Sequence, residues 1–245
     1  MGDSPTIRIP AVQMQAEFIR ILLKHGFGKD KARTCASVFT GNSLDGVLSH
    51  GVNRFSRFVN YIVDGLIDVD GEPELVHSAG AVEQWNGNLG PGPLNAIRCT
   101  ERAMELARTS GIGCVALRNT NHWMRGGTYG WRAAKAGFVF IGWTNTIGLM
   151  PAWGANDNKL GNNPLVIAVP YGEEAIVLDM AMSQYSYGRM EMKAIENSML
   201  DFKTRFQKSL PIIKTLYLLM NSRIFDIPEN AFCKSELQIF AMVFL

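Results

Sequence analysis

The last part of the chain lacks glycine. All 24 glycines of the 245-residue sequence lie at or before Gly188, and all five tryptophans lie at or before Trp153. A compact domain of helices and strands usually needs glycine in tight turns and at helix C-termini, where the backbone φ angle is positive. We therefore expect residues 194–245 to be an atypical tail, either a purely helical extension or a segment foreign to the preceding fold.

Charge imbalance and long apolar runs are absent as well. Lys and Arg number 24 against 22 Asp and Glu, a net charge of +2, which gives no basic field for nucleic acid. The densest apolar stretch, residues 137–150, is interrupted by Thr144, Asn145 and Thr146, so we expect no membrane span. The first residues are polar and do not resemble a signal peptide.

Cysteine is scarce and offers no ligand pairs. The four cysteines are widely spaced and form no Cys-x-x-Cys pair (Cys35, Cys99, Cys114 and Cys233). The four histidines are equally scattered, so no metal site is expected. Isolated thiols are typical of a cytoplasmic protein with reduced cysteines. The Gly-x-Gly-x-x-Gly motif of Rossmann folds, the P-loop and the common hydrolase motifs are also missing.

What the sequence does contain is enough apolar residue, 47%, to form a sizeable core. Apolar residues recur at helical spacing in three stretches near the N-terminus, residues 10–24, 29–44 and 51–62. In the third stretch the apolar stripe begins with Phe55 and Phe58. We expect residues 1–70 to form a helical subdomain.

Short strands and helices alternate after Gly71. Strands are predicted at residues 74–77, 81–85, 114–117, 138–143, 165–169 and 175–179, and helices at residues 94–108 and 126–136. This alternation is typical of an α/β or mixed α+β body, which we place at residues 71–193. Since the Rossmann motif is absent, a Rossmann dinucleotide site cannot be argued from the sequence.

Ser49 to Arg54 form the first motif that could carry chemistry. His50 and Arg54 are four residues apart and would share one face of a helix. A guanidinium binds a carboxylate through two parallel hydrogen bonds, and an imidazole can protonate an adjacent carbonyl oxygen. This pair suits a 2-oxo acid. A histidine at a helix end with a solvated arginine is the alternative interpretation.

The second motif, residues 118–127, directly follows a predicted strand. Asn121, His122, Trp123 and Arg125 precede a Gly-Gly pair that begins a helix. Strand ends are where open α/β sheets bind their ligands, and helix N-termini favour anions. A polar loop with Trp123 packed into the core is the alternative.

Two weaker motifs follow. Residues 161–164, Gly-Asn-Asn-Pro, read as a turn that leads into a strand. Residues 175–181 are an apolar strand with one carboxylate, Asp179, near its end. Asp179 could accept a hydrogen bond from a ribose hydroxyl, could orient a catalytic group, or could be a solvated turn residue.

In this order, the four motifs resemble those of the malate/L-lactate dehydrogenase family, whose fold is unrelated to the Rossmann enzymes. The resemblance covers about residues 7–193 and rests on Ser49-His50-Gly51 with Arg54, Asn121-His122 with Arg125-Gly126-Gly127, Gly161 to Pro164, and Asp179 to Ser183. Four ordered motifs are far more specific than any one of them.

The resemblance implies a reductase of 2-oxo acids that uses NADH, with NADPH as the alternative cofactor. It implies that His50 is the proton donor. It implies that the substrate contacts Ser49, Arg54, Asn121, His122 and Arg125. It implies that the cofactor contacts Asn163, Ala175, Ile176, Val177, Leu178, Asp179, Met180 and Ala181.

The resemblance further implies a cytoplasmic homodimer with a small-molecule substrate, without nucleic acid, membrane or metal. The motifs are most similar to those of members that act on a 2,3-diketo sugar acid, while malate, lactate, a ureidoglycolate or a cyclic imino acid stay open. Family members continue beyond 245 residues with a Gly-rich segment that this sequence lacks. We therefore expect the tail to come from a frameshifted or truncated reading frame, and a catalytically impaired remnant is the alternative to an active reductase.

Overall fold

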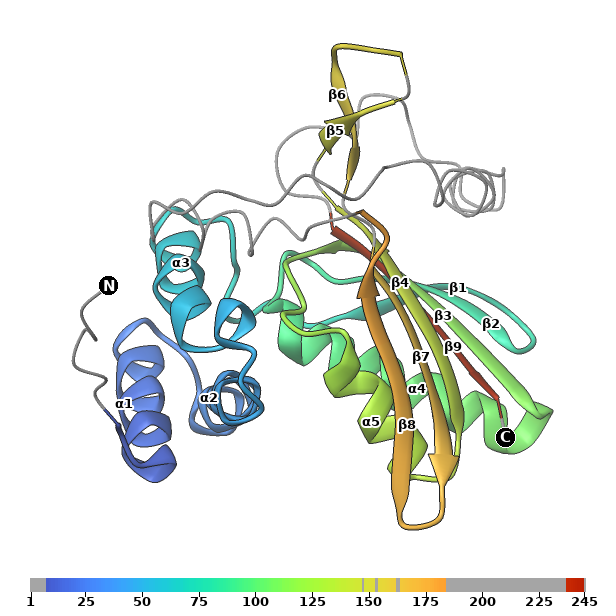
Figure 1. Cartoon of the computed structure of the whole chain (residues 1–245), viewed down its shortest axis with the longest axis horizontal. Helices are drawn as coiled ribbons and strands as arrows, with labels where there is room; N and C mark the ends of the chain where they lie inside the picture. The colour runs from blue at the N-terminus through green and yellow to red at the C-terminus, as the bar shows by residue number, and fades with distance from the viewer. Residues whose placement is uncertain (1–7, 147, 153, 162–163, 184–236, 245) are drawn as a thin grey trace, which may run out of the picture.

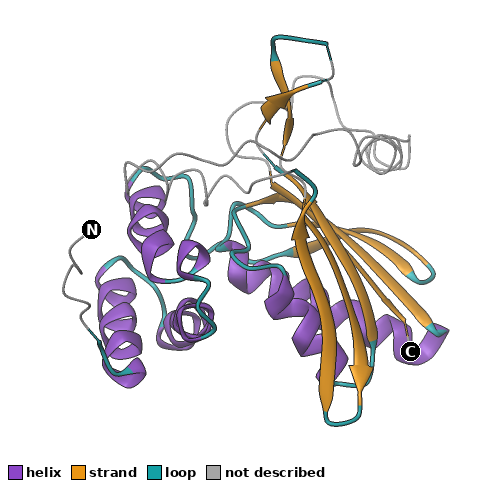
Figure 2. Cartoon of the chain, in the orientation of Figure 1, coloured by secondary structure: helices purple, strands orange, loops and turns teal. Residues whose placement is uncertain are grey.

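The computed structural model describes residues 8–146, 148–152, 154–161, 164–183 and 237–244. Its first part is helical and consists of α1 (Ala11–Lys24), α2 (Lys29–Leu44), a short 3-10 turn η1 (Leu48–His50) and α3 (Val52–Val63). Its second part is a sheet with two helices on it, as Figures 1 and 2 show. The three predicted N-terminal helices are confirmed to within one residue at each end.

Four phenylalanine rings build the core of the helical part. Phe18 of α1 stacks on Phe55 of α3 with the ring centroids 4.0 Å apart, and Phe39 of α2 meets Phe55 and Phe58 edge-on at 5.2 Å. All four side chains are at most 6% exposed. Each buried ring stabilises the fold by roughly 2–3 kcal/mol relative to an exposed one, so these contacts fix how the three helices pack.

The sheet has seven strands in the order β1-β2-β3-β9-β4-β7-β8. The strands are β1 (Glu74–Ala79), β2 (Val82–Asn86), β3 (Ile112–Thr120), β4 (Val139–Asn145), β7 (Pro164–Tyr171), β8 (Glu174–Ala181) and β9 (Leu237–Phe244). Strands β2 and β3 are parallel and connected by α4 (Gly92–Ser110), whereas the other neighbouring pairs are antiparallel. The predicted strands and both predicted helices are present, so the fold is a mixed one.

Helices α4 and α5 (Gly127–Lys135) lie against one face of the sheet (Figure 1). Alternate side chains of the strands point toward these helices, because successive residues of a strand face opposite sides. Val115 of β3, Phe140 of β4 and Val166 of β7 are fully buried there. This second core is a cluster distinct from the phenylalanine core of the helical part, and Ile97 of α4 packs against both.

Two features of this fold are not predicted from the sequence. Strands β5 (Gly148–Pro151) and β6 (Asn158–Gly161) form an antiparallel pair that projects beyond the sheet (Figure 1). Strand β9 pairs with β3 on one side and β4 on the other, although its residues belong to the segment expected to be an atypical tail. Its near-continuous apolar run, LQIFAMVF, is typical of a strand flanked on both sides.

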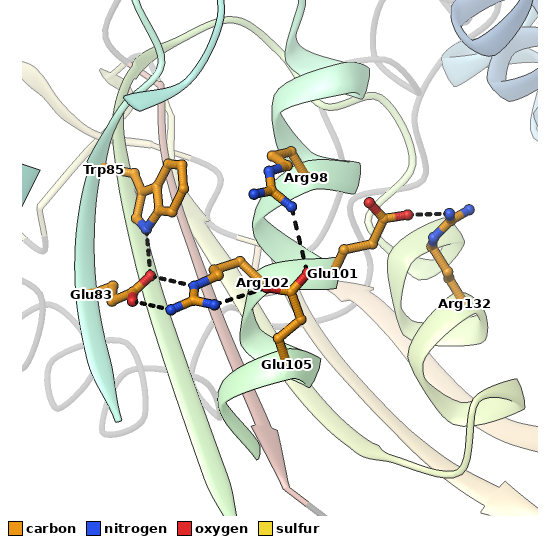
Figure 3. A network of polar contacts seen from close by, with 7 residues as sticks. All are labelled: Glu83, Trp85, Arg98, Glu101, Arg102, Glu105 and Arg132. Carbon is orange, nitrogen blue, oxygen red and sulfur yellow. Dashed lines mark hydrogen bonds and ion pairs between the residues drawn. The ribbon is translucent and has the colours of Figure 1, made fainter. Parts of the chain in front are cut away.

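A buried carboxylate connects the sheet to α4 (Figure 3). Glu83 of β2 is 2% exposed and accepts hydrogen bonds from the Trp85 indole at 2.9 Å and from Nη2 of Arg102 at 2.7 Å. The hydrogen bonds from Arg102 lower the pKa of Glu83, although burial acts in the opposite direction. Arg102 lies on α4, is 31% exposed and also donates to Glu105 at 2.8 Å.

We expect Arg102→Met to destabilise the protein more than Glu83→Gln does. The first change leaves the buried carboxylate without its cation, at about 3 kcal/mol, whereas the second leaves a guanidinium that water can still reach, at about 1 kcal/mol. The pKa of Glu83 is lowered in the folded state. The stabilisation of the fold by the Glu83–Arg102 pair is therefore present at neutral pH. It is lost as the pH falls below the ordinary glutamate pKa of about 4.5 and through the lowered pKa of Glu83.

Urea unfolding at pH 7 measures both losses. Glu105→Gln is the control, because its side chain is 44% exposed and an exposed pair contributes little. Equal losses for Arg102→Met and Glu83→Gln would contradict the role assigned to burial.

Candidate active site

His50 lies in the 3-10 turn η1, between α2 and α3. The prediction that His50 and Arg54 share one helical face holds only in part, because α3 begins after His50, at Val52. The two side chains nevertheless belong to one cluster. Nε of Arg54 donates to the backbone carbonyl of Ser49 at 3.3 Å, and Oγ of Ser49 is 3.0 Å from Nδ1 of His50.

A second histidine faces the first. His122, in the loop after β3, has its ring centroid 5.5 Å from that of His50, at an interplanar angle of 41°. The pKa of His50 is lowered to about 4, first by burial and then by the charges of Arg54 and Arg125. The pKa of His122 is lowered well below its usual range, again by burial first. Both imidazoles are therefore neutral at pH 7 in the free chain.

The backbone fixes the tautomer of His122. Its Nδ1 accepts a hydrogen bond from the backbone N–H of Met124 at 2.9 Å. An accepting Nδ1 carries no proton, so a neutral His122 carries its proton on Nε2. Met124 adopts a φ angle of 68° and buries its side chain in the phenylalanine core of the helical part. The loop is thus anchored at the point where it orients His122.

Arg125 is held by groups of the protein itself. Its Nη1 donates to Asp45 at 2.5 Å, its Nε lies 3.8 Å from Oδ2 of Asp179, and its guanidinium lies 4.4 Å from the ring centroid of Trp131. The same oxygen of Asp179 accepts from the backbone N–H of Gly127 at 2.8 Å. Burial raises the pKa of Asp179, and the Gly127 hydrogen bond and the Arg125 charge oppose that rise.

The amide of Asn121 supports neighbouring loops. Its Nδ2 donates to the backbone carbonyls of Leu66 and Leu89, both at 3.0 Å, and the residue is 6% exposed. Next to it, Trp123 is 2% exposed and stacks on Tyr129, as the core interpretation of this tryptophan predicts. The loop after β3 therefore combines a structural amide with a histidine directed at His50.

The alternation of β8 separates the predicted cofactor residues onto two faces. Ala175 and Val177 pack against the helix-covered core, and Asp179 reaches the start of α5. Ile176, Leu178 and Met180 are 58%, 46% and 40% exposed. Ala181 is the last residue of the strand, and Asn163 lies outside the described residues. The predicted residues therefore do not all line one surface.

Gly51 allows the backbone directly after turn η1 to lie close to Ser43 of α2. A Cβ at this position would lie 2.3 Å from Oγ and 2.9 Å from the backbone nitrogen of Ser43. The same Oγ accepts a hydrogen bond from the N–H of Val52, the first residue of α3, at 2.9 Å. A glycine is needed here because of this close packing, since any Cβ would collide with Ser43.

Three residues that contact His50 or Arg125 are not predicted from the sequence, namely Asn42, Asp45 and Trp131. Asn42, 2% exposed, continues the predicted apolar stripe of α2, which includes Phe39 three residues earlier. A polar residue on a buried stripe is a signal that could have identified it. Asp45 gives no comparable signal, because its partner Arg125 lies 80 residues away in the sequence. Trp131 lies in the helix that begins just after Arg125, and its contact with the guanidinium follows from how the loop folds back on that helix.

No helix of the described residues is long and apolar enough to cross a membrane. Within the same residues, no cluster of three or more His, Cys, Asp or Glu side chains could hold a metal ion.

The sequence profile of the malate/L-lactate dehydrogenase family matches residues 9–208, and the chain belongs to this family. It is 44% identical over 189 residues to a 2,3-diketo-L-gulonate reductase of Escherichia coli O139:H28 (strain E24377A / ETEC). That alignment covers 77% of this chain and 57% of the reductase, so the chain spans little more than half the length of this relative.

Solved structures of the same architecture are similar along almost the whole chain. A malate dehydrogenase from Pyrococcus horikoshii OT3 has a TM-score of 0.82 at 25% identity, with 97% of this chain and 75% of that chain covered. A malate dehydrogenase from Entamoeba histolytica has a TM-score of 0.87 at 22% identity, with 98% of this chain and 79% of that chain covered. This second similarity concerns the fold.

We expect Gly51→Ala to destabilise the protein by about 2 kcal/mol, because the new methyl group must displace Ser43. Gly41→Ala is the matched control. It lies in α2 and its Cβ would meet nothing within 4 Å, so it should stabilise the helix by about 0.5–1 kcal/mol. Denaturant unfolding measures both changes, and a stabilising Gly51→Ala would contradict the packing described for this turn.

Proposed function

We propose that the chain is a nicotinamide-dependent reductase of 2-oxo acids, with a 2,3-diketo sugar acid such as 2,3-diketo-L-gulonate as substrate. The observation that carries the proposal is the pairing of His50 and His122 at 5.5 Å beside Arg54. Two neutral imidazoles beside a guanidinium suit an anionic ligand that has a carbonyl next to its carboxylate. Membership of the malate/L-lactate dehydrogenase family and the resemblance to a named 2,3-diketo-L-gulonate reductase support the same chemistry.

The residues of β8 fit a nicotinamide cofactor. Ile176, Leu178 and Met180 offer an exposed apolar row for aromatic rings, and Asp179 near the end of the strand offers a carboxylate oxygen to a hydroxyl. When bound, such a cofactor supplies hydride to the C2 carbonyl carbon of the substrate. NADH is the cofactor we propose, by resemblance to the reductase, and NADPH is the alternative.

The mechanism assigns a separate task to each residue. Arg54 binds the substrate carboxylate and so presents one face of the carbonyl. His122 carries its proton on Nε2. From there it donates a hydrogen bond to the substrate and stays neutral. Ser49 contacts Nδ1 of His50. Once substrate binding has brought a proton onto His50, its Nε2–H gives a proton to the carbonyl oxygen as negative charge develops there, and a neutral imidazole remains. Asn121 and Arg125 hold the loop that carries His122.

We extend the proposal to the setting of the enzyme. Reduced thiols suit the cytoplasm, and Cys35 and Cys99 are buried, with thiol pKa values raised by burial. The family resemblance favours a homodimer for the intact protein. Malate, lactate, a ureidoglycolate and a cyclic imino acid are the competing substrates.

Purified chain should oxidise NADH in the presence of 2,3-diketo-L-gulonate, and His50→Ala should lower kcat by at least about 100-fold with little change in KM. His77→Ala is the matched control, because His77 lies on the exposed strand β1. Absorbance at the NADH band measures turnover. Oxidation with malate or lactate alone would reassign the substrate, and an unchanged kcat in His50→Ala would overturn the proton-donor role.

Affinity for a 2-oxo acid analogue should fall as the pH rises. The pKa of His50 is about 4 in the free chain, so the imidazole is neutral above that pH. A bound carboxylate cancels part of the Arg54 charge, which raises the pKa of His50 and draws in a proton. Binding therefore takes up protons and weakens at high pH.

Calorimetric titration with oxamate in two buffers of different ionisation enthalpy measures this proton uptake. His50→Gln should abolish it while binding persists. Identical heats in the two buffers for the unsubstituted chain would contradict the prediction.

A further inference from the structure

The position of His50 depends on contacts outside its own turn. Turn η1 has three residues, makes no side-chain capping hydrogen bond and connects two helices that pack on the phenylalanine core. So short a turn does not hold a side chain rigidly, because each end is free to shift with its neighbours. A reacting imidazole, by contrast, must be placed to within a fraction of an ångström.

Asn42 supplies one such contact. It lies in the last turn of α2, is 2% exposed, and donates from Nδ2 to the backbone carbonyl of His50 at 3.0 Å. Its own backbone carbonyl accepts from the N–H of Val47 at 2.9 Å, which closes the loop between α2 and η1. A buried amide is costly unless its polar atoms are paired, so these contacts also explain why an asparagine is tolerated here.

The other end of the same amide reaches across to the sheet domain. Oδ1 of Asn42 accepts a hydrogen bond from the hydroxyl of Thr128 at 2.9 Å. Thr128 lies in the first turn of α5, next to Gly127, whose N–H holds Asp179. One side chain therefore connects the backbone of His50 to the helix start that also binds the carboxylate of β8.

We infer that Asn42 is a positioning residue, which fixes His50 relative to the start of α5 and thereby relative to Asp179. This inference rests on the proposed function for its catalytic consequence, but not for its geometry. Asn42 does not contact the reacting atoms in this arrangement and acts through the backbone of His50. A role confined to stability is the competing explanation, and the experiment separates the two.

The experiment compares Asn42→Ala with Val38→Ala. Val38 lies on the same helix, is 6% exposed and belongs to the phenylalanine core, so its truncation destabilises α2 without touching His50. The chain has four histidines, so isotope-labelled histidine gives four ring signals that report His50 separately whether or not the chain turns over substrate. We expect the His50 signal to shift or broaden in Asn42→Ala and to stay unchanged in Val38→Ala.

In turnover assays, Asn42→Ala should lower kcat by about 10- to 100-fold with KM changed less than about threefold, and Val38→Ala should change neither. Thr128→Val removes the hydrogen bond from Thr128 to Asn42 and leaves the one from Asn42 to His50. It should therefore lower kcat less than Asn42→Ala does. If Asn42→Ala does not fold, Asn42→Leu replaces it, because leucine keeps the volume of the buried side chain but cannot donate to the carbonyl of His50.

An unchanged His50 signal in the folded Asn42 variant would overturn the inference, as would equal shifts in Val38→Ala. If the unsubstituted chain shows no turnover, the proposed function fails. In that case the ring signals still decide whether Asn42 positions His50.

Discussion

The pairing of His50 with His122 depends on the contacts by which the loop after β3 and the first turn of α5 pack on the helical part. Met124 inserts into the phenylalanine core, Arg125 pairs with Asp45 at the end of α2, and Thr128 donates to Asn42. These contacts are apolar, ionic and hydrogen-bonded in turn, so no single substitution removes them all. Together these contacts set the distance between His50, in the turn between α2 and α3, and His122, in the loop after β3.

The arginine charges around the two histidines disfavour a bound cation and favour a bound anion. Burial and the nearby arginines lower the pKa values of both histidines, which keeps them neutral. The carboxylates of Asp45 and Asp179 lie beside Arg125, and Arg54 donates a hydrogen bond to the backbone carbonyl of Ser49 beside His50. An entering carboxylate would add a negative charge beside His50 and Arg54, and the same charge would favour the protonated form of His50. Binding and proton supply are thus one electrostatic event in the proposed mechanism.

Strand β8 shows how far a local motif can be interpreted. Residues 175–181 form one apolar run in the sequence, yet in the strand they divide between a face packed on α5 and an exposed face. Asp179 contacts Gly127 at the start of α5 and lies near Arg125 of the loop that carries His122. A cofactor on this edge would therefore contact the exposed row and the strand end, and not the whole run.

The sequence by itself determined the helices, most strands, the mixed fold and the family, because hydrophobic spacing, turn residues and ordered motifs are local properties. Through the family resemblance it also grouped His50 with Ser49, Arg54, Asn121, His122 and Arg125 as candidate catalytic and substrate-binding residues. Only the tertiary structure decided that Asn121 supports loops, that Arg125 is paired with Asp45, that Asn42 holds His50, and that β9 lies between β3 and β4. Those facts join residues far apart in the chain, and contacts of that kind are set by packing, which no local pattern encodes.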